Sequence, residues 1–268
     1  MTGLTSLVLP TYNPGPAIER TWAEVERFLA ARSDPWEAVF VLDGCTDGTP
    51  GRLARLARTG HPRVCVVGYP TNRGKGFAVR TGLLAARGAV RVFTDVDLAY
   101  PFDDIVRVAD TLRAGAAVAV ACRDHPDSRV VLPPGLLGYA RRRHFQSRIF
   151  GALARRLLPI TQRDTQAGLK GMTAAVARSL VPQLGCDGFG FDCELLTACA
   201  KAGVPVAEVP VSVRYDTAAS TTGLRATARM LRELWQIRRA WRNRTVPVVL
   251  SATVAVPEPT RPRVPAAA

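Results

Sequence analysis

Long apolar runs are absent from this sequence of 268 residues, since none reaches the roughly 18 to 20 residues that a membrane-spanning helix needs. The six cysteines form no CxxC pair and show no zinc-finger spacing. No signal-peptide pattern precedes the first strand-like segment. We therefore expect reduced thiols in a cytoplasmic protein, and peripheral attachment to the inner face of a membrane remains open.

Histidine is also scarce. His61, His125 and His144 are the only three, and their wide separation argues against a histidine metal site or a catalytic triad.

Acidic residues are outnumbered, with 22 Asp and Glu against 36 Lys and Arg, which gives a formal net charge of +14. Such a charge favours anionic partners: nucleotides, lipid phosphates, nucleic acid or acidic membranes. Most of the excess falls in residues 139–156 and 225–244. A basic nucleic-acid-binding protein is one alternative, but no helix-turn-helix, RNP or zinc pattern is present, so we expect no nucleic-acid partner.

Strand-like and helix-like segments alternate through the first half of the chain, beginning with LTSLVLP and AIERTWAEVERFLAAR. This alternation predicts an α/β fold, with a doubly wound, mostly parallel sheet flanked by helices. The length suits a single domain over residues 1–244. Residues 245–268 are rich in Pro, Ala and Val, and we expect this tail to be disordered towards its end.

Two segments combine helical periodicity with many arginines: residues 139–158 and the final helix of the domain, residues 223–244. Such basic amphipathic helices either lie on an anionic membrane or pack an apolar stripe on the core and leave a solvated basic face. Trp235 and Trp241, in the final helix, suit a membrane interface, although Trp235 also suits the core.

Polar motifs follow the first four predicted strands: PTYN, DGCTDG, TNRGKG and DVD. In doubly wound sheets ligands bind at the carboxyl ends of the strands, because the connecting loops and helix N-termini converge there. We therefore expect these four motifs to form one site.

Asp95 and Asp97 stand one residue apart in the fourth motif. A turn at the strand end can bring both carboxylates to one hard cation, and oxygen ligands beside a phosphate-rich substrate favour Mg²⁺ or Mn²⁺. The alternative is an aspartate that caps the next helix or closes a turn.

The third motif places Lys75 between Gly74 and Gly76 at a predicted helix start. Backbone N–H groups there, together with the ammonium, would attract a diphosphate. The spacing is not that of a Walker A motif. The alternative is a glycine-rich turn with an exposed lysine.

Six motifs occur in a specific order: LVLPTYN, VLDGCTDGT, NRGKGFAVRTG, DVD, RDTQAGLKGM and GFGFDCELL. This series resembles the family 2 inverting glycosyltransferases of GT-A fold, and within them the dolichyl-phosphate glucosyltransferases and polyprenyl-phosphate mannosyltransferases. The resemblance covers about residues 4 to 215. It implies a nucleoside diphosphate sugar as donor and Mg²⁺ or Mn²⁺ as cofactor.

The resemblance also implies roles for residues at the donor. Asp95 would contact the donor, and Asp97 would hold the metal that bridges its diphosphate. The remaining implied donor-binding residues are Pro10, Tyr12 and Asp43 at the base and ribose, and Lys75 with the amides of Gly74 and Gly76 by the nucleotide.

The resemblance places Arg123 near the phosphates, and it implies that Arg123, Asp164 and Asp97 are the catalytic residues. On the acceptor side it places Asp164, with Gln166 next to it. Arg143, four residues before Ser147, is implied to meet an acceptor phosphate. Glu194 matches a family acid, assigned to the acceptor side without a defined role.

Two departures from the family pattern leave the donor and acceptor undefined. Ala99 stands where many polyprenyl-phosphate mannosyltransferases carry a glutamine that helps to hold the metal. A lysine expected after VSVRY is absent, and Ser220 and Thr221 occupy that region.

The resemblance implies a hexosyltransferase that uses a UDP-glucose or GDP-mannose type of donor and a polyprenyl phosphate acceptor; the main alternative is the same donor with a soluble small-molecule hydroxyl as acceptor. A lipid phosphate is already ionised near neutral pH and needs no strong base, whereas a soluble hydroxyl acceptor would need one, for which Asp164 is the candidate. A sugar-nucleotide pyrophosphorylase is a further alternative, although its glycine-rich loop should follow the first strand. The oligomeric state is not indicated.

Overall fold

The computed structural model describes residues 3–131, 137–214, 224–244 and 246. Within these ranges it does not describe the side chains of residues 130, 137, 139–146, 214 and 224–228. Ser220, Thr221 and almost all of the predicted tail lie outside the described residues.

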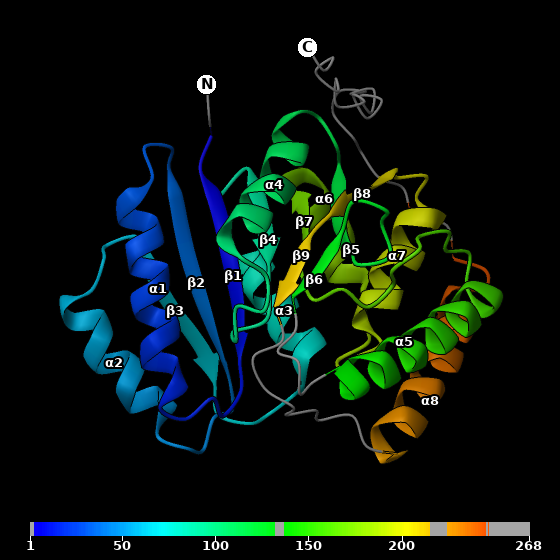
Figure 1. Ribbon diagram of the computed structural model, residues 1–268, viewed down its shortest axis with the longest axis horizontal. Coiled ribbons are helices and arrows are strands. Elements are labelled where there is room, and N and C mark those ends of the chain that lie inside the picture. The colour runs from blue at the N-terminus through cyan, green and yellow to red at the C-terminus, as the bar shows by residue number, and fades with distance from the viewer. Residues whose placement is uncertain (1–2, 132–136, 215–223, 245, 247–268) are drawn as a thin grey trace, which may run out of the picture.

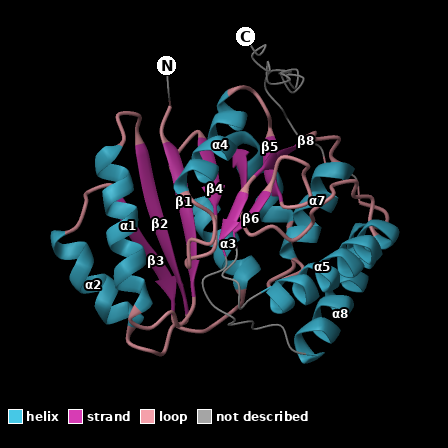
Figure 2. Ribbon diagram, in the orientation of Figure 1, coloured by secondary structure: helices cyan, strands magenta, loops and turns pink. Residues whose placement is uncertain are grey.

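A central sheet of seven strands organises the molecule, in the order β3-β2-β1-β4-β7-β5-β8 (Figures 1 and 2). Strand β7 is antiparallel to β4 and β5, and the other pairs are parallel, which confirms the mostly parallel α/β prediction. The strands are β1 (Thr5–Thr11), β2 (Trp36–Asp43), β3 (Val64–Tyr69), β4 (Val90–Phe93), β5 (Val118–Cys122), β7 (Lys170–Thr173) and β8 (Val206–Pro210).

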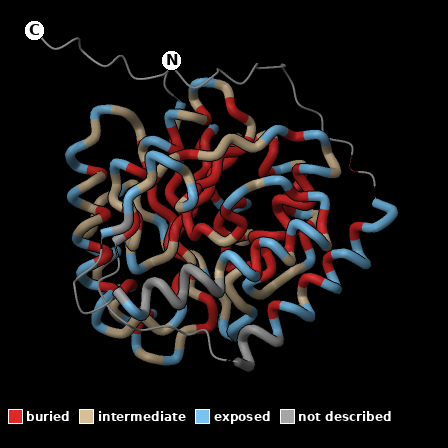
Figure 3. Tube along the Cα trace, turned by 45° about the vertical axis from the view of Figure 1, so that its right-hand side comes forward, coloured by how far each residue is buried: buried red, intermediate tan, exposed pale blue. Residues whose placement is uncertain are grey.

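Helices cover both faces of the sheet, because successive side chains of each strand point to opposite sides. Leu7 and Leu9 of β1 pack with one set of helices, and Val8 packs with the other. The first set is α1 (Ala17–Ala31), α2 (Thr49–Thr59) and α4 (Phe102–Arg113). The second set is α3 (Lys75–Ala85), α6 (Ala174–Leu180) with the short 3-10 turn Val181–Gln183, and α7 (Phe191–Lys201). Figure 3 shows the buried residues concentrated in the interior of the molecule.

Two basic helices, α5 (Leu137–Leu157) and α8 (Leu224–Trp241), lie side by side beyond α7 (Figure 1). Both place an apolar stripe in the core, including Ala154 on α5 and Leu234 on α8. Trp241 is buried, whereas Trp235 is 60% exposed and is not a core residue. Among the described residues, no helix has the length and apolar character needed to cross a membrane.

A second sheet of two parallel strands, β6 (Arg129–Val131) and β9 (Ser212–Arg214), was not predicted as a separate sheet. The hydroxyl of Ser128 ties it to the main sheet, because this group donates to Cys122 O at 2.6 Å and accepts the Val211 N–H at 2.9 Å.

Candidate functional site

The first four strands are parallel and adjacent, so the four polar motifs meet at one edge of the sheet as predicted. Pro10 pairs with Val41 and Thr11 with Leu42 in the parallel register, which places Tyr12 and Asp43 at neighbouring strand ends. Tyr12 is 53% exposed, so its ring is accessible for a stacking contact. Contact of Pro10 and Tyr12 with a nucleotide base remains a prediction.

Asp43 organises the loop that follows β3. Its carboxylate is buried and accepts hydrogen bonds from Asn72 Nδ2 at 3.0 Å, Arg73 N at 2.7 Å and Gly74 N at 3.0 Å. The structure thus assigns this carboxylate to holding the Lys75 loop. A direct contact with ribose remains a prediction.

The phosphate-cradle interpretation of Gly74 and Gly76 requires a correction. The Gly74 N–H donates to Asp43, and the Gly76 N–H donates to the Asp187 carbonyl at 2.8 Å. Both amides are therefore occupied by groups of the protein, and they are not free to bind a diphosphate in this conformation. Of the three residues, only Lys75 places a charged group, its ammonium, beside Asp95.

Lys75 and Asp95 form an ion pair, with Nζ 2.6 Å from Oδ1 and side-chain exposures of 18% and 40%. Burial lowers the pKa of Lys75, but the carboxylates of Asp95, Asp192 and Asp97 raise it by more, so its pKa lies above the ordinary value. The lysine is therefore charged at neutral pH, and it faces several carboxylates of the site.

Asp97 lies at the open side of the same turn and is exposed, and its Oδ1 accepts the Ala99 N–H at 3.2 Å. In the described part of the chain, no three Asp, Glu, His or Cys side chains gather into a complete metal cage. Two carboxylates on one turn nevertheless fit Mg²⁺ or Mn²⁺, because such ions are commonly held by one or two carboxylates and completed by substrate phosphates and water. Asp95 and Asp97 are thus suitable ligands.

Gly168 brings the RDTQAGLK segment against this turn. A Cβ at this position would lie 2.2 Å from Asp95 Oδ2, so only glycine permits so close an approach. The sequence analysis did not assign a role to Gly168, since nothing in the local pattern reveals a contact between segments so far apart in the chain.

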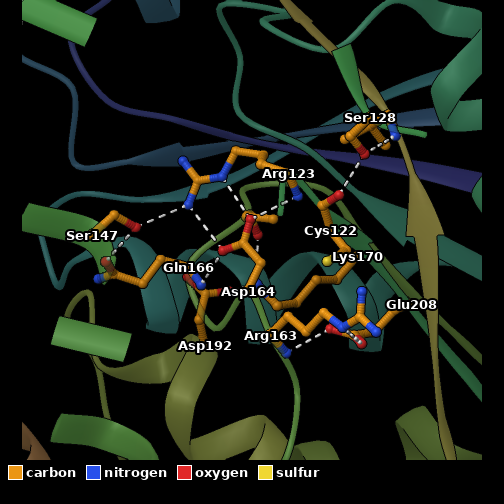
Figure 4. A network of polar contacts seen from close by, with 12 residues as sticks. Cys122, Arg123, Ser128, Ser147, Arg163, Asp164, Gln166, Lys170, Asp192 and Glu208 are labelled. Carbon is orange, nitrogen blue, oxygen red and sulfur yellow. Dashed lines mark hydrogen bonds and ion pairs between the residues drawn. The ribbon is translucent and has the colours of Figure 1, made fainter. Parts of the chain in front are cut away.

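Arg123 and Asp164 are the centre of a polar network (Figure 4). Arg123 Nε and Nη2 donate to the two carboxylate oxygens at 2.7 and 2.9 Å, and the Arg123 N–H adds a third bond at 3.0 Å. Ser147 Oγ accepts from Arg123 Nη2 at 3.3 Å and donates to Gln166 Oε1 at 3.5 Å. The structure thus brings together four of the predicted residues: Arg123, Ser147, Asp164 and Gln166.

Burial alone would raise the pKa of Asp164, but the charge and hydrogen bonds of Arg123 lower it to about 2. A carboxylate with so low a pKa is a weak proton acceptor at neutral pH. The geometry therefore argues against Asp164 as the general base that a hydroxyl acceptor would need.

Lys170 and Asp192 form a buried ion pair that the sequence analysis missed. Lys170 is fully buried, its Nζ lies 2.8 Å from Asp192 Oδ1, and it also donates to the Ala167 carbonyl. The pair links the start of β7 to the first turn of α7, below Asp164 (Figure 4). The only hint in the sequence was that Lys170 stands in the motif RDTQAGLKGM at the start of a strand. Its partner could not be predicted, because the partner depends on the tertiary fold.

Glu194, on α7, is buried and has well-defined partners. Its carboxylate accepts the Gly185 N–H at 2.9 Å, the Cys186 N–H at 2.6 Å and Trp241 Nε1–H at 2.9 Å. These bonds fix the loop whose Asp187 carbonyl binds the start of α3, and they attach the end of α8. Glu194 therefore stabilises the loop that holds the start of α3. Its direct contact with an acceptor remains a prediction.

Arg143 lies on α5 one turn before Ser147. Its side chain belongs to the part of α5 that the structure does not describe, so its contact with an acceptor phosphate also remains a prediction.

Comparison with known proteins gives a consistent result. The family model described as glycosyl transferase family 2 matches residues 6–180. The chain is 27% identical over 224 residues to dolichyl-phosphate beta-glucosyltransferase of Saccharomyces cerevisiae, covering 77% of this chain and 66% of that protein. It is 31% identical to glycosyltransferase AglD of Haloferax volcanii, covering 87% of this chain and 37% of that protein. The chain thus spans just under two thirds of the yeast relative and a smaller part of the archaeal one.

Solved structures share the fold at lower identity. Glucosyl-3-phosphoglycerate synthase from Mycobacterium tuberculosis, in complex with UDP, superposes with a TM-score of 0.62 at 20% identity over 88% of this chain and 80% of that chain. The same synthase with Mn²⁺, UDP and phosphoglyceric acid gives a TM-score of 0.61 at 20% identity over 90% of this chain and 79% of that chain.

Proposed function

Because the chain belongs to glycosyl transferase family 2, we propose that it transfers a hexose from a nucleoside diphosphate sugar to a polyprenyl phosphate with inversion at the anomeric carbon. The similarity to dolichyl-phosphate glucosyltransferases supports a lipid phosphate acceptor and a UDP-glucose type of donor. A GDP-mannose type of donor is the second choice, because the sequence motifs also resemble mannosyltransferases. Residues 1–244 form the proposed catalytic domain.

The observation that carries the acceptor proposal is the bidentate pair of Arg123 and Asp164, with Nε–Oδ2 and Nη2–Oδ1 distances of 2.7 and 2.9 Å. Arg123 holds the pKa of Asp164 at about 2, so this carboxylate is poorly suited to remove a proton from a hydroxyl. A phosphate acceptor carries an ionised oxygen already and needs no such base. Arg123, with Ser147 and Gln166, supplies donors that suit a phosphate group.

On the donor side, Asp95 and Asp97 are the proposed ligands of Mg²⁺ or Mn²⁺, and Asp95 also orients Lys75. A bound divalent ion would supply positive charge that stabilises the departing diphosphate. The charged Lys75, which is paired with Asp95, would add to the same stabilisation. The acceptor oxygen then bonds to the anomeric carbon while the bond from that carbon to the diphosphate oxygen breaks, and the diphosphate leaves with the electron pair.

A soluble phosphorylated hydroxyl acceptor is the second candidate, because the structural neighbour was solved with phosphoglyceric acid. Such an acceptor would use Arg123 for its phosphate but would need another proton acceptor than Asp164. We also propose peripheral contact with an anionic membrane surface on the cytoplasmic side, where a polyprenyl phosphate is accessible.

A transfer assay tests the proposal. Purified protein is given UDP- and GDP-sugars with Mg²⁺ or Mn²⁺, and either a short, water-soluble polyprenyl phosphate or 3-phosphoglycerate. We expect chelator-sensitive release of nucleoside diphosphate only with the polyprenyl phosphate. Turnover with phosphoglycerate alone would instead establish the soluble acceptor, and radiolabel accumulating in a nucleotide sugar would indicate a pyrophosphorylase.

A further inference from the structure

A cavity of about 290 Å³ lies between the C-terminal ends of α5, α7 and α8. Four cationic residues line it: Arg156 from α5, Lys201 from α7, Arg238 from α8, and Arg242 directly after the end of α8. None of them forms an ion pair with a carboxylate of the described residues. Many other arginines of the chain are paired in this way, so this cavity gathers charge that no carboxylate in the described part of the chain pairs with.

Three helix C-termini meet at this cavity, and cations are favourable at such ends even without a ligand. Each terminus carries roughly half a negative charge. Four full positive charges exceed that contribution, so the cavity remains net positive and suits an anion. Arg156, Arg238 and Arg242 are exposed, so their guanidinium groups are accessible to a ligand from outside.

The cavity is separate from the catalytic site. Helix α7 has 11 residues and is therefore about 16 Å long. Asp192, paired with Lys170 near the acceptor network, stands in its first turn, and Lys201 ends it. The cavity thus lies at the opposite end of α7 from the acceptor network.

Exposed apolar side chains continue the same side of α8. Leu231, Trp235 and Arg238 follow at intervals of four and three residues, so they share one stripe of the helix, and Arg242 comes directly after the helix end. Leu231 is 42% exposed and Trp235 is 60% exposed, and Ile149 on the neighbouring α5 is 55% exposed. A tryptophan and aliphatic side chains beside arginines are the composition that binds the interface of an anionic membrane.

We propose that this α5–α7–α8 cavity binds the phosphate headgroup of an anionic phospholipid while Leu231 and Trp235 enter the bilayer interface. The lipid is a second ligand, distinct from the polyprenyl phosphate that accepts the sugar. The inference deepens the proposed function, because it names the surface that brings the enzyme to its membrane-borne acceptor. Charge complementarity favours a phospholipid bilayer over a neutral surface.

Vesicle binding by the full chain, with no polyprenyl phosphate or donor present, tests this site. Vesicles of phosphatidylcholine alone are compared with vesicles that also contain phosphatidylglycerol. We expect binding only to the anionic vesicles. Arg238→Gln with Arg242→Gln should weaken it roughly 30-fold, which corresponds to about 1 kcal/mol for each cation removed.

The matched control is Arg27→Gln with Arg58→Gln. Both arginines are exposed, lie on α1 and α2 at the other end of the molecule (Figure 1), and form no ion pair among the described residues. This variant loses the same charge and should bind as the parent protein does. If the two double variants lost vesicle affinity equally, the effect would be one of net charge alone and the proposed site would be overturned. Equal binding to vesicles with and without phosphatidylglycerol would overturn it as well.

Tryptophan fluorescence gives a readout that needs no variant of the cavity. Trp22, Trp36 and Trp241 are at most 2% exposed, so Trp235 is the one accessible tryptophan of the four. We expect a blue shift on anionic vesicles, quenching by brominated lipid, and loss of both in Trp235→Phe. Vesicle binding without any change in Trp235 would contradict the proposed orientation.

Two further measurements distinguish a lipid headgroup from a free phosphate ester as the ligand, and the membrane site from the proposed transfer activity. Glycerol phosphate in solution should compete weakly, and full displacement of the protein from vesicles would show a site for free phosphate esters and overturn the membrane assignment. Transfer to a short, water-soluble polyprenyl phosphate without vesicles tests the proposed function by itself. Its failure would leave the vesicle result standing, and failure of vesicle binding would leave the transfer result standing.

Discussion

Arg123 donates three hydrogen bonds to the carboxylate of Asp164: its guanidinium binds both oxygens, and its backbone N–H binds Oδ2 at 3.0 Å. The sheet creates this pair, because β5 ends immediately before Arg123 and its antiparallel neighbour β7 begins after the segment that holds Asp164. The pair therefore forms where the end of β5 meets the segment that leads into β7, the antiparallel strand of the sheet.

Replacing Asp164 with asparagine should destabilise the protein by about 2 kcal/mol at neutral pH, since its pKa is lowered from 3.8 to about 2. A carboxyl group whose pKa is lowered in the folded protein stabilises the fold at every pH above its ordinary pKa, and this contribution is lost as the pH falls through the lowered pKa. The difference between variant and parent should therefore shrink as the pH falls from about 4 towards 2. Urea unfolding across this range measures it.

Asp110→Asn is the control for this experiment, because Asp110 pairs with Arg113 at 2.7 Å with a side chain that is 59% exposed. Exposed pairs contribute roughly 0 to 1 kcal/mol. A loss in Asp164→Asn no larger than that of the control would show that the buried pair does not stabilise the fold.

Asp97→Ala should reduce transfer at least about 100-fold and leave stability nearly unchanged, because the carboxylate is exposed and is a proposed metal ligand. Transfer rates and Mn²⁺ binding in the presence of nucleoside diphosphate, followed by electron paramagnetic resonance, should decline together. Asp103→Ala, an exposed acid in the first turn of α4, is the matched control. Undiminished transfer by the Asp97 variant in chelator would refute the metal assignment.

The sequence predicted that the ends of the first four strands meet at one edge of the sheet, because that follows from strand order and motif position alone. It did not predict how the glycine amides are used. Gly74 and Gly76 read as a phosphate cradle, but Asp43 and the Asp187 carbonyl bind those amides through contacts between segments distant in the chain. Local pattern cannot reveal such partners.

The same limit explains the missed pair of Lys170 and Asp192. A buried charge requires a partner, but its identity depends on how β7 and α7 pack, which no periodicity specifies. The basic, amphipathic character of α8 could be predicted from the sequence. That Trp241 is buried and Trp235 is exposed could be seen only in the structure.

Lys75→Met should lower kcat/KM for the donor roughly 10- to 100-fold, in line with the loss of one charged contact to a phosphate. The variant removes the cation that lies 2.6 Å from Asp95 and leaves the carboxylates of the site to repel the diphosphate. Steady-state kinetics at varied donor concentration measures the effect. Arg58→Met removes an exposed charge on α2 and should not change it, and equal kinetics for both variants would exclude Lys75 from donor binding.

Glu194→Gln should destabilise the protein by about 1 to 3 kcal/mol, because one carboxylate oxygen that accepts N–H groups becomes an NH₂ that cannot. Glu24→Gln on α1 is the control, since its only described ion pair, with Arg20, is long at 3.6 Å and exposed. Urea unfolding measures both variants. Unchanged stability in Glu194→Gln would rule out the supporting role.

A double-mutant cycle with Trp241→Phe then distinguishes support of the fold from contact with an acceptor. Trp241 donates to Glu194 at 2.9 Å, so the two substitutions should be non-additive in unfolding free energy. If Glu194 instead binds the acceptor, its substitution should raise the acceptor KM while the unfolding energies simply add. The buried position of Glu194 and its three internal donors favour the first result, in which α8 and the loop that holds α3 lose stability together.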